Sequence, residues 1–150
     1  MIKKGFVIFD QRYRNDLFDF KQHDKLRDEI ITTILLNPYT MVLVKPHPRQ
    51  NVELLKEKLV KYNSERVMIA EEPSMFLADT CIPVILGESS ICFDCLAMDS
   101  PAIEYSRNAG SIYKGLYRKG GFVYPANNPG ELIEGVKKIY GVVLDIGKHQ

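Results

Sequence analysis

Short apolar runs alternate along this chain with segments whose apolar residues recur at helical spacing. The first run, Gly5 to Asp10, is rich in Val, Ile and Phe, which is typical of a buried strand. From Lys25 to Leu36 the apolar residues recur every three or four positions, and Asn37-Pro38 ends this predicted helix. The chain therefore begins with a strand followed by a helix.

The same alternation continues toward the end of the chain. It predicts further strands at Thr40 to Lys45, Arg66 to Ile69, Ile82 to Leu86, Pro101 to Tyr105 and Phe122 to Tyr124. It predicts further helices over Leu54 to Val60, from Ser89 or Ser90 to Met98, and over Pro129 to Tyr140, with a brief one capped within Glu71 to Ser74. Ser106 to Gly121 shows no clear period and is predicted to be a mobile surface loop.

Repeated strand-helix units favour a parallel sheet, because each crossover covers one face of the sheet and the strands become apolar throughout. The length of 150 residues suits one domain. The predicted fold is a three-layer, Rossmann-like, doubly wound α/β sheet that spans residues 1–150 as a single domain. Ligands of such sheets bind beyond the carboxyl ends of the strands, so the turns that leave the strands are the candidate sites.

Charge and composition exclude several classes of function. Twenty Lys and Arg against nineteen Asp and Glu give a net charge of +1, which supplies no broad positive field for nucleic acid. The sequence shows neither a membrane span nor a signal peptide. Three cysteines are too few for a disulfide scaffold and suit a reducing compartment, so we expect a cytoplasmic protein.

The turn after the second predicted strand reads Lys45-Pro46-His47-Pro48-Arg49. The two prolines restrict the backbone, so the imidazole of His47 is held on a stiff turn. It can donate to a phosphate oxygen, and Lys45 or Arg49 can add positive charge. The alternative is a rigid turn with solvated cations.

The turn after the strand at Ile82 to Leu86 reads Gly87-Glu88-Ser89-Ser90. A tight turn at glycine and amides at a following helix start outline an anion site. The alternative is an ordinary N-cap by serine. The segment is neither a Walker loop nor a hydrolase nucleophile elbow, because it lacks the residues that either motif needs.

Cys92 and Cys95 form a Cys-x-x-Cys pair that lies on one face of the predicted helix. A redox site is one interpretation, but the surrounding sequence lacks the thioredoxin context, so two small buried side chains are favoured. Cys81 and His47 are too scattered to complete a zinc site.

Two other strand ends also carry charged residues. Asp10, Arg12 and Arg14 follow the first strand, where the arginines can meet a phosphate or simply lie at the surface. Glu104 ends the strand PAIEY, where an acid can accept the hydroxyls of a ribose.

The segments VLVKPHPRQN (Val42 to Asn51) and SMFLADTCIPVILGESSICFDCLAMDSPAIEY (Ser74 to Tyr105) resemble the carboxyl-terminal, nucleotide-binding half of the GT-B glycosyltransferases. They are similar to CDP-glycerol glycerophosphotransferases, which have Lys-Pro-His-Pro followed by Asp-Tyr-Ser-Ser. They are also similar to bacterial sialyltransferases and capsule Kdo transferases, which have a His-Pro and a Ser-Ser motif. The likeness covers roughly Lys4 to Tyr140.

The resemblance implies a donor-nucleotide-binding domain of a surface-polysaccharide transferase, for capsule or a teichoic-acid-like polymer, with a CMP- or CDP-activated donor. It makes His47 the ligand of the donor phosphate and the catalytic residue, Ser89 and Ser90 contacts to phosphate or cytidine, and Glu104 a ribose contact. The candidate donor-binding residues from the turns and the resemblance together are Lys45, His47, Arg49, Gly87, Glu88, Ser89, Ser90, Glu104 and Arg12. No metal and no cofactor besides the donor are expected.

Two departures qualify what the resemblance implies. Gly87-Glu88 stands where the glycerophosphotransferases have Asp-Tyr, which leaves the donor open. The sequence also lacks the amino-terminal domain in which the family binds its acceptor. We therefore expect a chain that binds a nucleotide without transferring on its own, and that meets its polysaccharide acceptor through another domain, at the inner face of the cell membrane. The alternatives are a non-catalytic interaction module, part of a sugar-nucleotide epimerase, or a thiol oxidoreductase.

Overall fold

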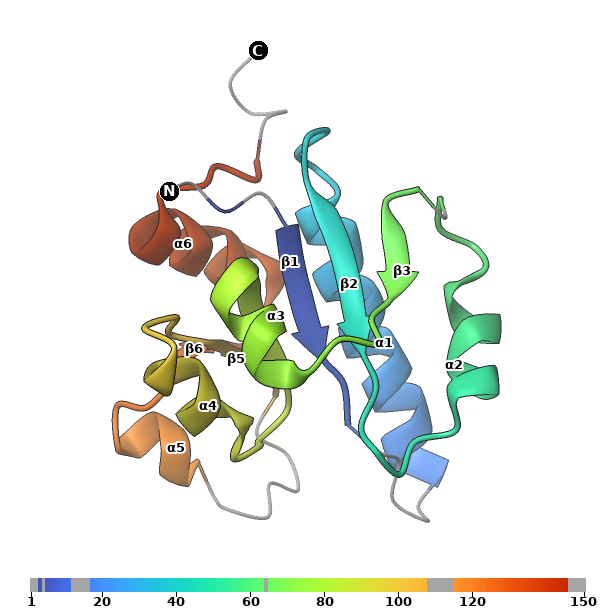
Figure 1. The fold of residues 1–150 in the computed structure, drawn as a ribbon, viewed down its shortest axis with the longest axis horizontal. Coiled ribbons are helices and arrows are strands. Elements are labelled where there is room, and N and C mark those ends of the chain that lie inside the picture. The colour runs from blue at the N-terminus through green and yellow to red at the C-terminus, as the bar shows by residue number, and fades with distance from the viewer. Residues whose placement is uncertain (1–2, 4, 12–16, 64, 108–114, 146–150) are drawn as a thin grey trace.

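Parallel strands form one sheet through the middle of the molecule. The computed structural model describes residues 3, 5–11, 17–63, 65–107 and 115–145. In these residues the strands are β1 (Gly5–Phe9), β2 (Met41–Lys45), β3 (Val67–Ile69), β4 (Ile82–Leu86), β5 (Ile103–Tyr105) and β6 (Tyr124–Ala126). Their order is β3-β2-β1-β4-β5-β6, and every neighbouring pair is parallel (Figure 1).

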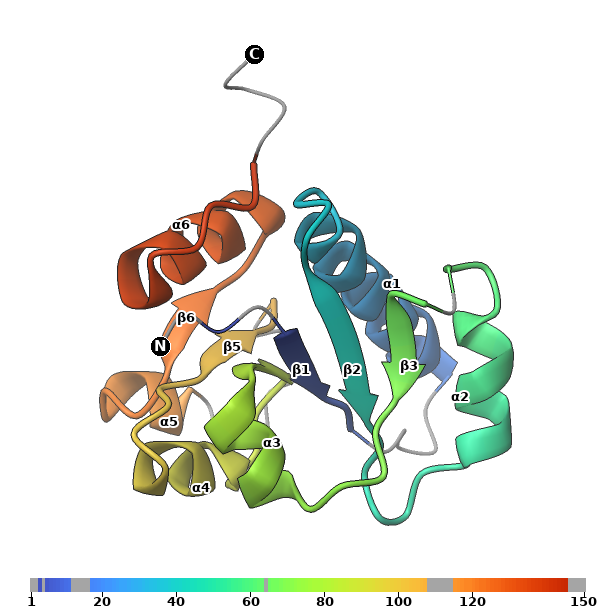
Figure 2. The same cartoon turned by 45° about the horizontal axis from the view of Figure 1, so that its top comes forward.

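Helices cover both faces of this sheet. They are α1 (Leu17–Ile34), α2 (Val52–Leu59), α3 (Ser74–Thr80), α4 (Ile91–Ala97), α5 (Leu116–Lys119) and α6 (Pro129–Tyr140). In Figures 1 and 2, α3 lies in front of the sheet and α1 behind it. Three layers result, and the predicted doubly wound α/β fold is confirmed. None of the helices within the described ranges is both long enough and apolar enough to span a membrane.

The direction in which the sheet grows reverses beside β1. From β1 the chain moves outward through β2 to β3, and then returns to place β4 on the other side of β1. In open parallel sheets, such a reversal leaves a crevice at the carboxyl ends of the strands, because the two following connections run to opposite faces. The topology therefore makes the edge beyond the end of β1, between the turns that leave β2 and β4, the expected position for a ligand.

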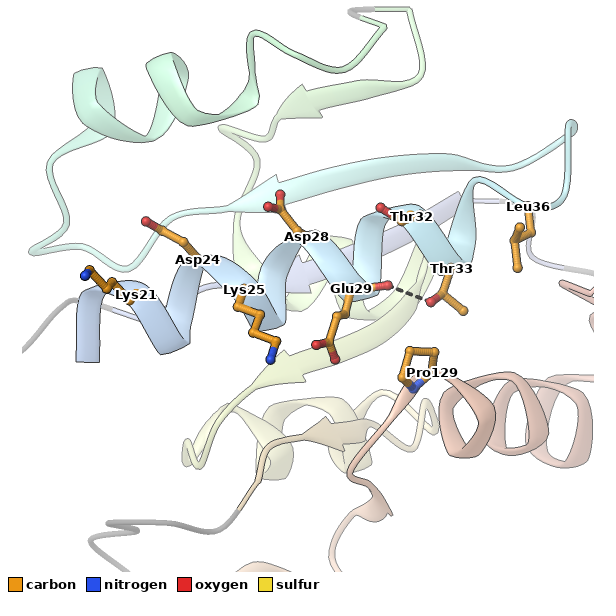
Figure 3. Close-up of a pocket in the computed structure, with 9 residues that line it drawn as sticks. All are labelled: Lys21, Asp24, Lys25, Asp28, Glu29, Thr32, Thr33, Leu36 and Pro129. Carbon is orange, nitrogen blue, oxygen red and sulfur yellow. Dashed lines mark hydrogen bonds between the residues drawn. The ribbon is translucent and has the colours of Figure 1, made fainter. Parts of the chain in front are cut away.

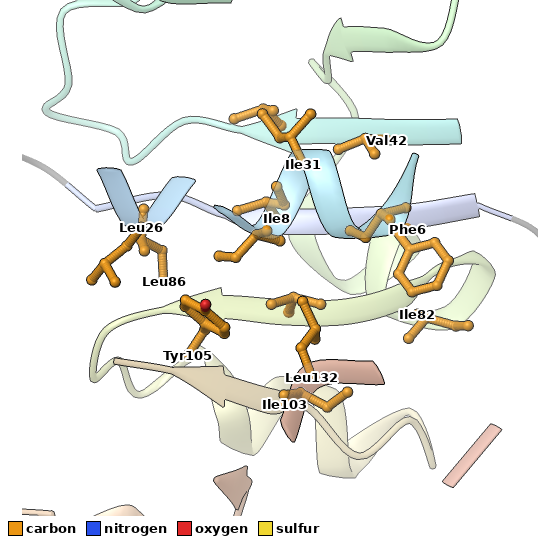
Figure 4. Close-up of a cluster of buried hydrophobic side chains, with 14 of the residues drawn as sticks. Phe6, Ile8, Leu26, Ile31, Val42, Ile82, Leu86, Ile103, Tyr105 and Leu132 are labelled. Carbon is orange, nitrogen blue, oxygen red and sulfur yellow. The ribbon is translucent and has the colours of Figure 1, made fainter. Parts of the chain in front are cut away.

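Each face of the sheet has its own core. Phe6 and Ile8 of β1 are fully buried against α1, α2 and α6, in the cluster drawn in Figure 4. Val7 and Phe9 point to the opposite face, where α3 and α4 cover them. This alternation follows from the two-residue period of a strand, and it explains why β1 is apolar throughout.

The last helix is bounded by residues whose conformations suit its two ends. Asn128 is the N-cap of α6 and accepts a hydrogen bond from the backbone N–H of Glu131 at 2.9 Å, and Pro129 follows it. Gly141 ends the helix with φ of 71°, in the left-handed region that glycine adopts without strain. The predicted bounds of this helix are confirmed.

Two predictions about secondary structure were wrong. Ser106 to Gly121 was predicted to be a loop, and its residues 108–114 lie outside the described residues, but its last part contains the helix α5, in which Tyr117 packs into the second core and is only 7% exposed. The last strand is β6 at Tyr124–Ala126 instead of Phe122 to Tyr124. Its position is set by pairing with β5, in which Ile103 aligns with Tyr124, and a short run of sequence does not reveal this register.

The first helix also begins earlier than predicted. It starts at Leu17, whereas the apolar period indicated a start near Lys25. His23 and Arg27 lie on the inward face of this extended helix, at the spacing that leads on to Ile30 and Ile34. Because both side chains are polar, they add nothing to the apolar period, and the period alone does not reach the first turns of the helix.

Candidate functional site

The ends of β1, β2 and β4 lie side by side. Phe9 aligns with Lys45 of β2 on one side and with Ile85 of β4 on the other. The backbone N–H of Asp10 donates to the carbonyl oxygen of Lys45 at 3.0 Å, which continues the pairing one residue past β1. The turns that begin at Pro46 and Gly87 therefore flank the end of β1.

The His47 turn is tightly hydrogen-bonded. The Nδ1 atom of His47 accepts from the backbone N–H of Arg49 at 3.1 Å, so the neutral ring carries its proton on Nε2. The carbonyl oxygen of His47 accepts from the backbone N–H of Gln50 at 2.9 Å. The imidazole therefore has a defined tautomer and a fixed backbone, in agreement with the stiff turn expected from its prolines.

Gln50 joins this turn to the end of β1. Its side-chain oxygen Oε1 accepts from the backbone N–H of His47 at 3.0 Å, and its Nε2 donates to Oδ2 of Asp10 at 3.0 Å. Only one orientation of the amide satisfies both contacts, because the N–H needs an acceptor and the carboxylate needs a donor. Sequence reasoning missed Gln50, since a glutamine after a proline turn carries no local signal of a long-range contact.

Asp10 is a buried carboxylate with several donors. Its Oδ1 accepts from His23 Nε2 at 2.8 Å, and its Oδ2 accepts from Arg27 Nε at 2.9 Å as well as from Gln50. Burial opposes ionisation, but the hydrogen bond from His23 and the charge of Arg27 outweigh it and lower the pKa of Asp10 to about 2. Asp10 therefore supplies a permanent negative charge behind the His47 turn.

The two cations of this turn lie in different surroundings. Lys45 Nζ donates to the carbonyl oxygen of Glu72 at 2.7 Å, so it is engaged with the segment between β3 and α3. Arg49 is exposed, and its backbone N–H serves His47. Arg49 is thus the more accessible of the two predicted phosphate cations, while Lys45 joins two neighbouring strand ends.

The turn after β4 has the backbone that its glycine predicts. Gly87 has φ of 84°, and its N–H donates to the carbonyl oxygen of Tyr105 at 2.9 Å. Ser89 precedes the N-cap, and its Oγ accepts from the backbone N–H of Ile91 at 3.3 Å. Ser90 is exposed at the N-cap position of α4, and its side chain makes no cap hydrogen bond. The hydroxyl of Ser89 therefore serves an amide at the start of α4, and Ser90 has the more available hydroxyl.

Glu88 contacts two other segments at this edge of the sheet. Its Oε2 accepts from the backbone N–H of Gly115 at 3.0 Å, in the turn that leads into α5. Its carbonyl oxygen accepts from Nε2 of Gln11, which follows β1, at 3.3 Å. Glu88 thus ties the turn after β4 to two other segments of the same edge.

Glu104 is buried beside β6 and α5, with an exposed fraction of 1%. Its Oε1 accepts from Arg118 Nε at 2.7 Å, whereas its Oε2 is buried and has no hydrogen-bond partner among the described residues. Burial raises the pKa of Glu104 and Arg118 opposes that rise. A ribose hydroxyl can reach Oε2 only when the residues that cover it move aside. Arg118 was missed because it falls in the segment predicted to be a loop.

The remaining predicted residues fall into two groups. Arg12, together with Arg14, lies outside the described residues. Cys92 and Cys95 are fully buried free thiols, and burial raises their pKa values to about 11 and about 12. A reactive thiolate needs a lowered pKa, so the prediction of two small buried side chains is confirmed. Across the described ranges, no group of three His, Cys, Asp or Glu side chains is arranged to hold a metal ion.

An open groove of about 730 Å³ runs along α1, away from these turns (Figure 3). Its acidic side chains are engaged: Asp24 pairs with Lys58 of α2, and Asp28 pairs with Lys61 at 2.6 Å. Glu29 accepts from the hydroxyl of Tyr105 at 2.5 Å. These pairs link α1 to its neighbours, so we assign the groove to packing of the helix and not to the candidate site.

Comparison with known proteins identifies the fold. No family model matches the chain, and no curated protein matches it. The structure is similar to the UDP-GlcNAc 2-epimerase of Methanocaldococcus jannaschii, with 13% identity and a TM-score of 0.61 over 94% of this chain and 40% of that one. It is also similar to the beta Kdo 2,4 transferase of Thermosulfurimonas dismutans, with 17% identity and a TM-score of 0.50 over 85% of this chain and 39% of that one.

The chain shares the fold of part of both enzymes. It spans about two fifths of the length of each. At these identities the comparison establishes the architecture, which is a Rossmann-like parallel sheet, and leaves function to the chemistry of the site.

Proposed function

We propose that this domain binds the nucleotide-activated donor of a surface-polysaccharide glycosyl- or glycerophosphotransferase, with a CMP- or CDP-activated donor. One observation carries the proposal: the His47 turn and the Gly87 turn flank the end of β1, where the growth of the sheet reverses. Hydrogen bonds from Gln50 to Asp10 and from Gln11 to Glu88 join both turns to β1. Ligands of open parallel sheets bind at such a reversal.

The chemistry of these turns suits a donor phosphate. The proton on Nε2 of His47 is the one that we assign to a phosphate oxygen, since Nδ1 is already occupied by the N–H of Arg49. The guanidinium of Arg49 adds charge, and the hydroxyl of Ser90 adds a donor from the other side. Transfer from a nucleotide donor leaves negative charge on the departing phosphate, and these groups stabilise that charge. We propose His47 as the catalytic residue for this reason.

The nucleotide itself has two candidates. The resemblance of the His-Pro and Ser-Ser motifs to transferases with cytidine-activated donors favours cytidine, and the likeness to a Kdo transferase agrees with it. The likeness to a UDP-GlcNAc 2-epimerase favours uridine as the second candidate. In either case the acceptor is a polysaccharide that another domain would bind, with the complete enzyme at the inner face of the membrane.

Calorimetric titration with CMP, CDP, UMP and UDP tests the proposal. We expect cytidine nucleotides to bind more tightly than uridine nucleotides, and His47→Ala to weaken CMP binding by about tenfold or more through loss of a charge-assisted hydrogen bond. A uridine preference would support the epimerase-like alternative. No binding of any nucleotide by the folded chain would reject the proposal in favour of an interaction module.

A second titration tests Glu104. Replacing CMP by its 2′-deoxy form removes one ribose hydroxyl, so it should weaken binding to the parent and have little effect on Glu104→Gln. Equal loss of affinity in parent and variant would show that Glu104 does not contact the ribose.

A further inference from the structure

Asp10 carries a fully enclosed charge at this edge of the sheet. Its side chain has an exposed fraction of 0%, and its two carboxylate oxygens accept from His23, Arg27 and Gln50. Arg27 is itself held at 2.8 Å by Asp24 on the same helix. A buried charge with partners on both sides has one favoured position, because any displacement would leave a donor or an oxygen unpaired.

Gln50 connects the fixed carboxylate of Asp10 to the His47 turn. Its amide has one end on Asp10 and the other on the backbone N–H of His47, each at 3.0 Å. Its own backbone N–H donates to the carbonyl oxygen of His47. Both backbone polar groups of His47 are therefore bonded to the same residue, and that residue is anchored to a buried carboxylate.

The ring of His47 depends on the same backbone. Its Nδ1 accepts from the N–H of Arg49 only while the turn keeps this conformation. That hydrogen bond places the proton of the neutral ring on Nε2. A turn released from Gln50 would lose the constraint that selects both the tautomer and the direction of the ring.

We infer that Asp10 and Gln50 are positioning residues that hold His47 in its phosphate-binding conformation and tautomer. The inference rests on the proposed function for the role of His47, and on the hydrogen bonds above for the role of its two supports. Asp10 and Gln50 are not assigned any contact with the nucleotide. Their effect on binding is exerted through His47 alone.

Variants of Gln50 test its two side-chain hydrogen bonds, one to Asp10 and one from the backbone N–H of His47. Gln50→Glu keeps an oxygen for the N–H of His47 but sets a carboxylate against Asp10, and Gln50→Met removes both hydrogen bonds at similar volume. We expect both variants to weaken CMP binding by about tenfold, in the range of one hydrogen bond to a charged group. In the His47→Ala background they should have no further effect, since their action passes through that ring.

Nitrogen-15 NMR of the histidine rings provides a readout that does not need the nucleotide. In the parent, the neutral ring of His47 should show the Nε2–H tautomer, and in Gln50→Met it should show a mixture of tautomers. Gln11→Met is the matched control, because Gln11 is a glutamine at the same edge whose amide contacts Glu88 instead of Asp10. It should leave the His47 tautomer unchanged.

The outcomes distinguish this inference from the proposed function. An unchanged His47 tautomer in folded Gln50→Met overturns the inference even if CMP binds. A tautomer shift in a chain that binds no nucleotide supports the positioning role and rejects the function. Asp10→Asn should reproduce the tautomer shift of Gln50→Met, and a folded Asp10→Asn variant with the parent tautomer would show that Asp10 takes no part.

Discussion

Arg118 Nε lies 2.7 Å from Oε1 of Glu104, and this pair joins α5 to β5. The same guanidinium donates to the carbonyl oxygens of Glu104 in β5 and of Ala126 at the end of β6, and to the side chain of Asn127. One side chain therefore neutralises a buried acid and satisfies backbone acceptors at the edge of the sheet. The stability of this edge should depend on it.

Arg118→Met is expected to destabilise the fold by about 3–5 kcal/mol, because it leaves the carboxylate of Glu104 buried without its partner. Burial already raises the pKa of Glu104 with Arg118 present. When the pKa of an acid is raised on folding, the folded protein loses stability as pH rises. The destabilisation of Arg118→Met relative to the parent should therefore grow between pH 5 and pH 8. Urea unfolding at several pH values measures it.

The double variant Glu104→Gln with Arg118→Met is the control for the pair. It removes the buried charge together with its partner, so it should recover part of the stability that Arg118→Met loses. If the double variant is less stable than Arg118→Met at pH 8, the unpaired carboxylate is not the cause of the loss.

Asp10 should make the stability of the fold sensitive to acid. The donors around it lower its pKa to about 2 from an ordinary 3.8. A lowered pKa gives stability that is present above the unfolded pKa and is lost as pH falls, and here this amounts to roughly 2 kcal/mol. The difference in stability between the parent and Asp10→Asn should therefore narrow as pH falls from 5 toward 2, measured by urea unfolding.

Glu53→Gln is the matched control for acid sensitivity. Glu53 is a carboxylate whose side chain is 81% exposed, beside Lys56. The free energy of unfolding of Glu53→Gln should differ from that of the parent by the same small amount at every pH, because exposed ion pairs contribute little to stability. If the free energies of unfolding of the parent and of Asp10→Asn differ by a constant amount from pH 5 to pH 2, the charge assigned to Asp10 is contradicted.

Local patterns in the sequence predicted the sheet and the turns at its edge. The runs at Ile82 to Leu86 and Gly5 to Asp10 are apolar because both faces of the strands are covered, and the structure places a strand in each. Gly87 marked a turn that needs a positive φ, and its φ is 84°. Each of these features is set by neighbours within a few residues, and so a single sequence contains it.

The supports of the site depend on contacts between distant segments. Gln50 is 40 residues from Asp10, and Arg118 is 14 from Glu104. A polar side chain acquires such a partner only after the strands are in register, so its type and spacing do not reveal it. His23 is an exception, because its spacing to Arg27 and Ile30 follows the inward face of α1 and could have indicated its burial.

The thiols of Cys92 and Cys95 should react slowly with a disulfide reagent at pH 7.5. Burial raises their pKa values to about 11 and about 12, so almost none of either thiol is ionised near neutral pH. Labelling in native buffer should be slower than labelling in denaturant, in which both residues should react. Rapid labelling of either thiol in the folded protein would restore the redox interpretation.

Gly87→Ala should destabilise the fold by about 1–2 kcal/mol, because its φ of 84° is unfavourable for a residue with a Cβ. The added methyl would meet Gln11 Cγ at 3.8 Å, an ordinary contact, so the cost comes from the backbone and not from a clash. Gly5→Ala is the control, since its Cβ would meet Cys81 Sγ at 3.6 Å without a positive φ. It should change stability by less than about 0.5 kcal/mol in urea unfolding. If Gly87→Ala and Gly5→Ala lose the same stability, the positive φ of Gly87 is not the cause of the loss.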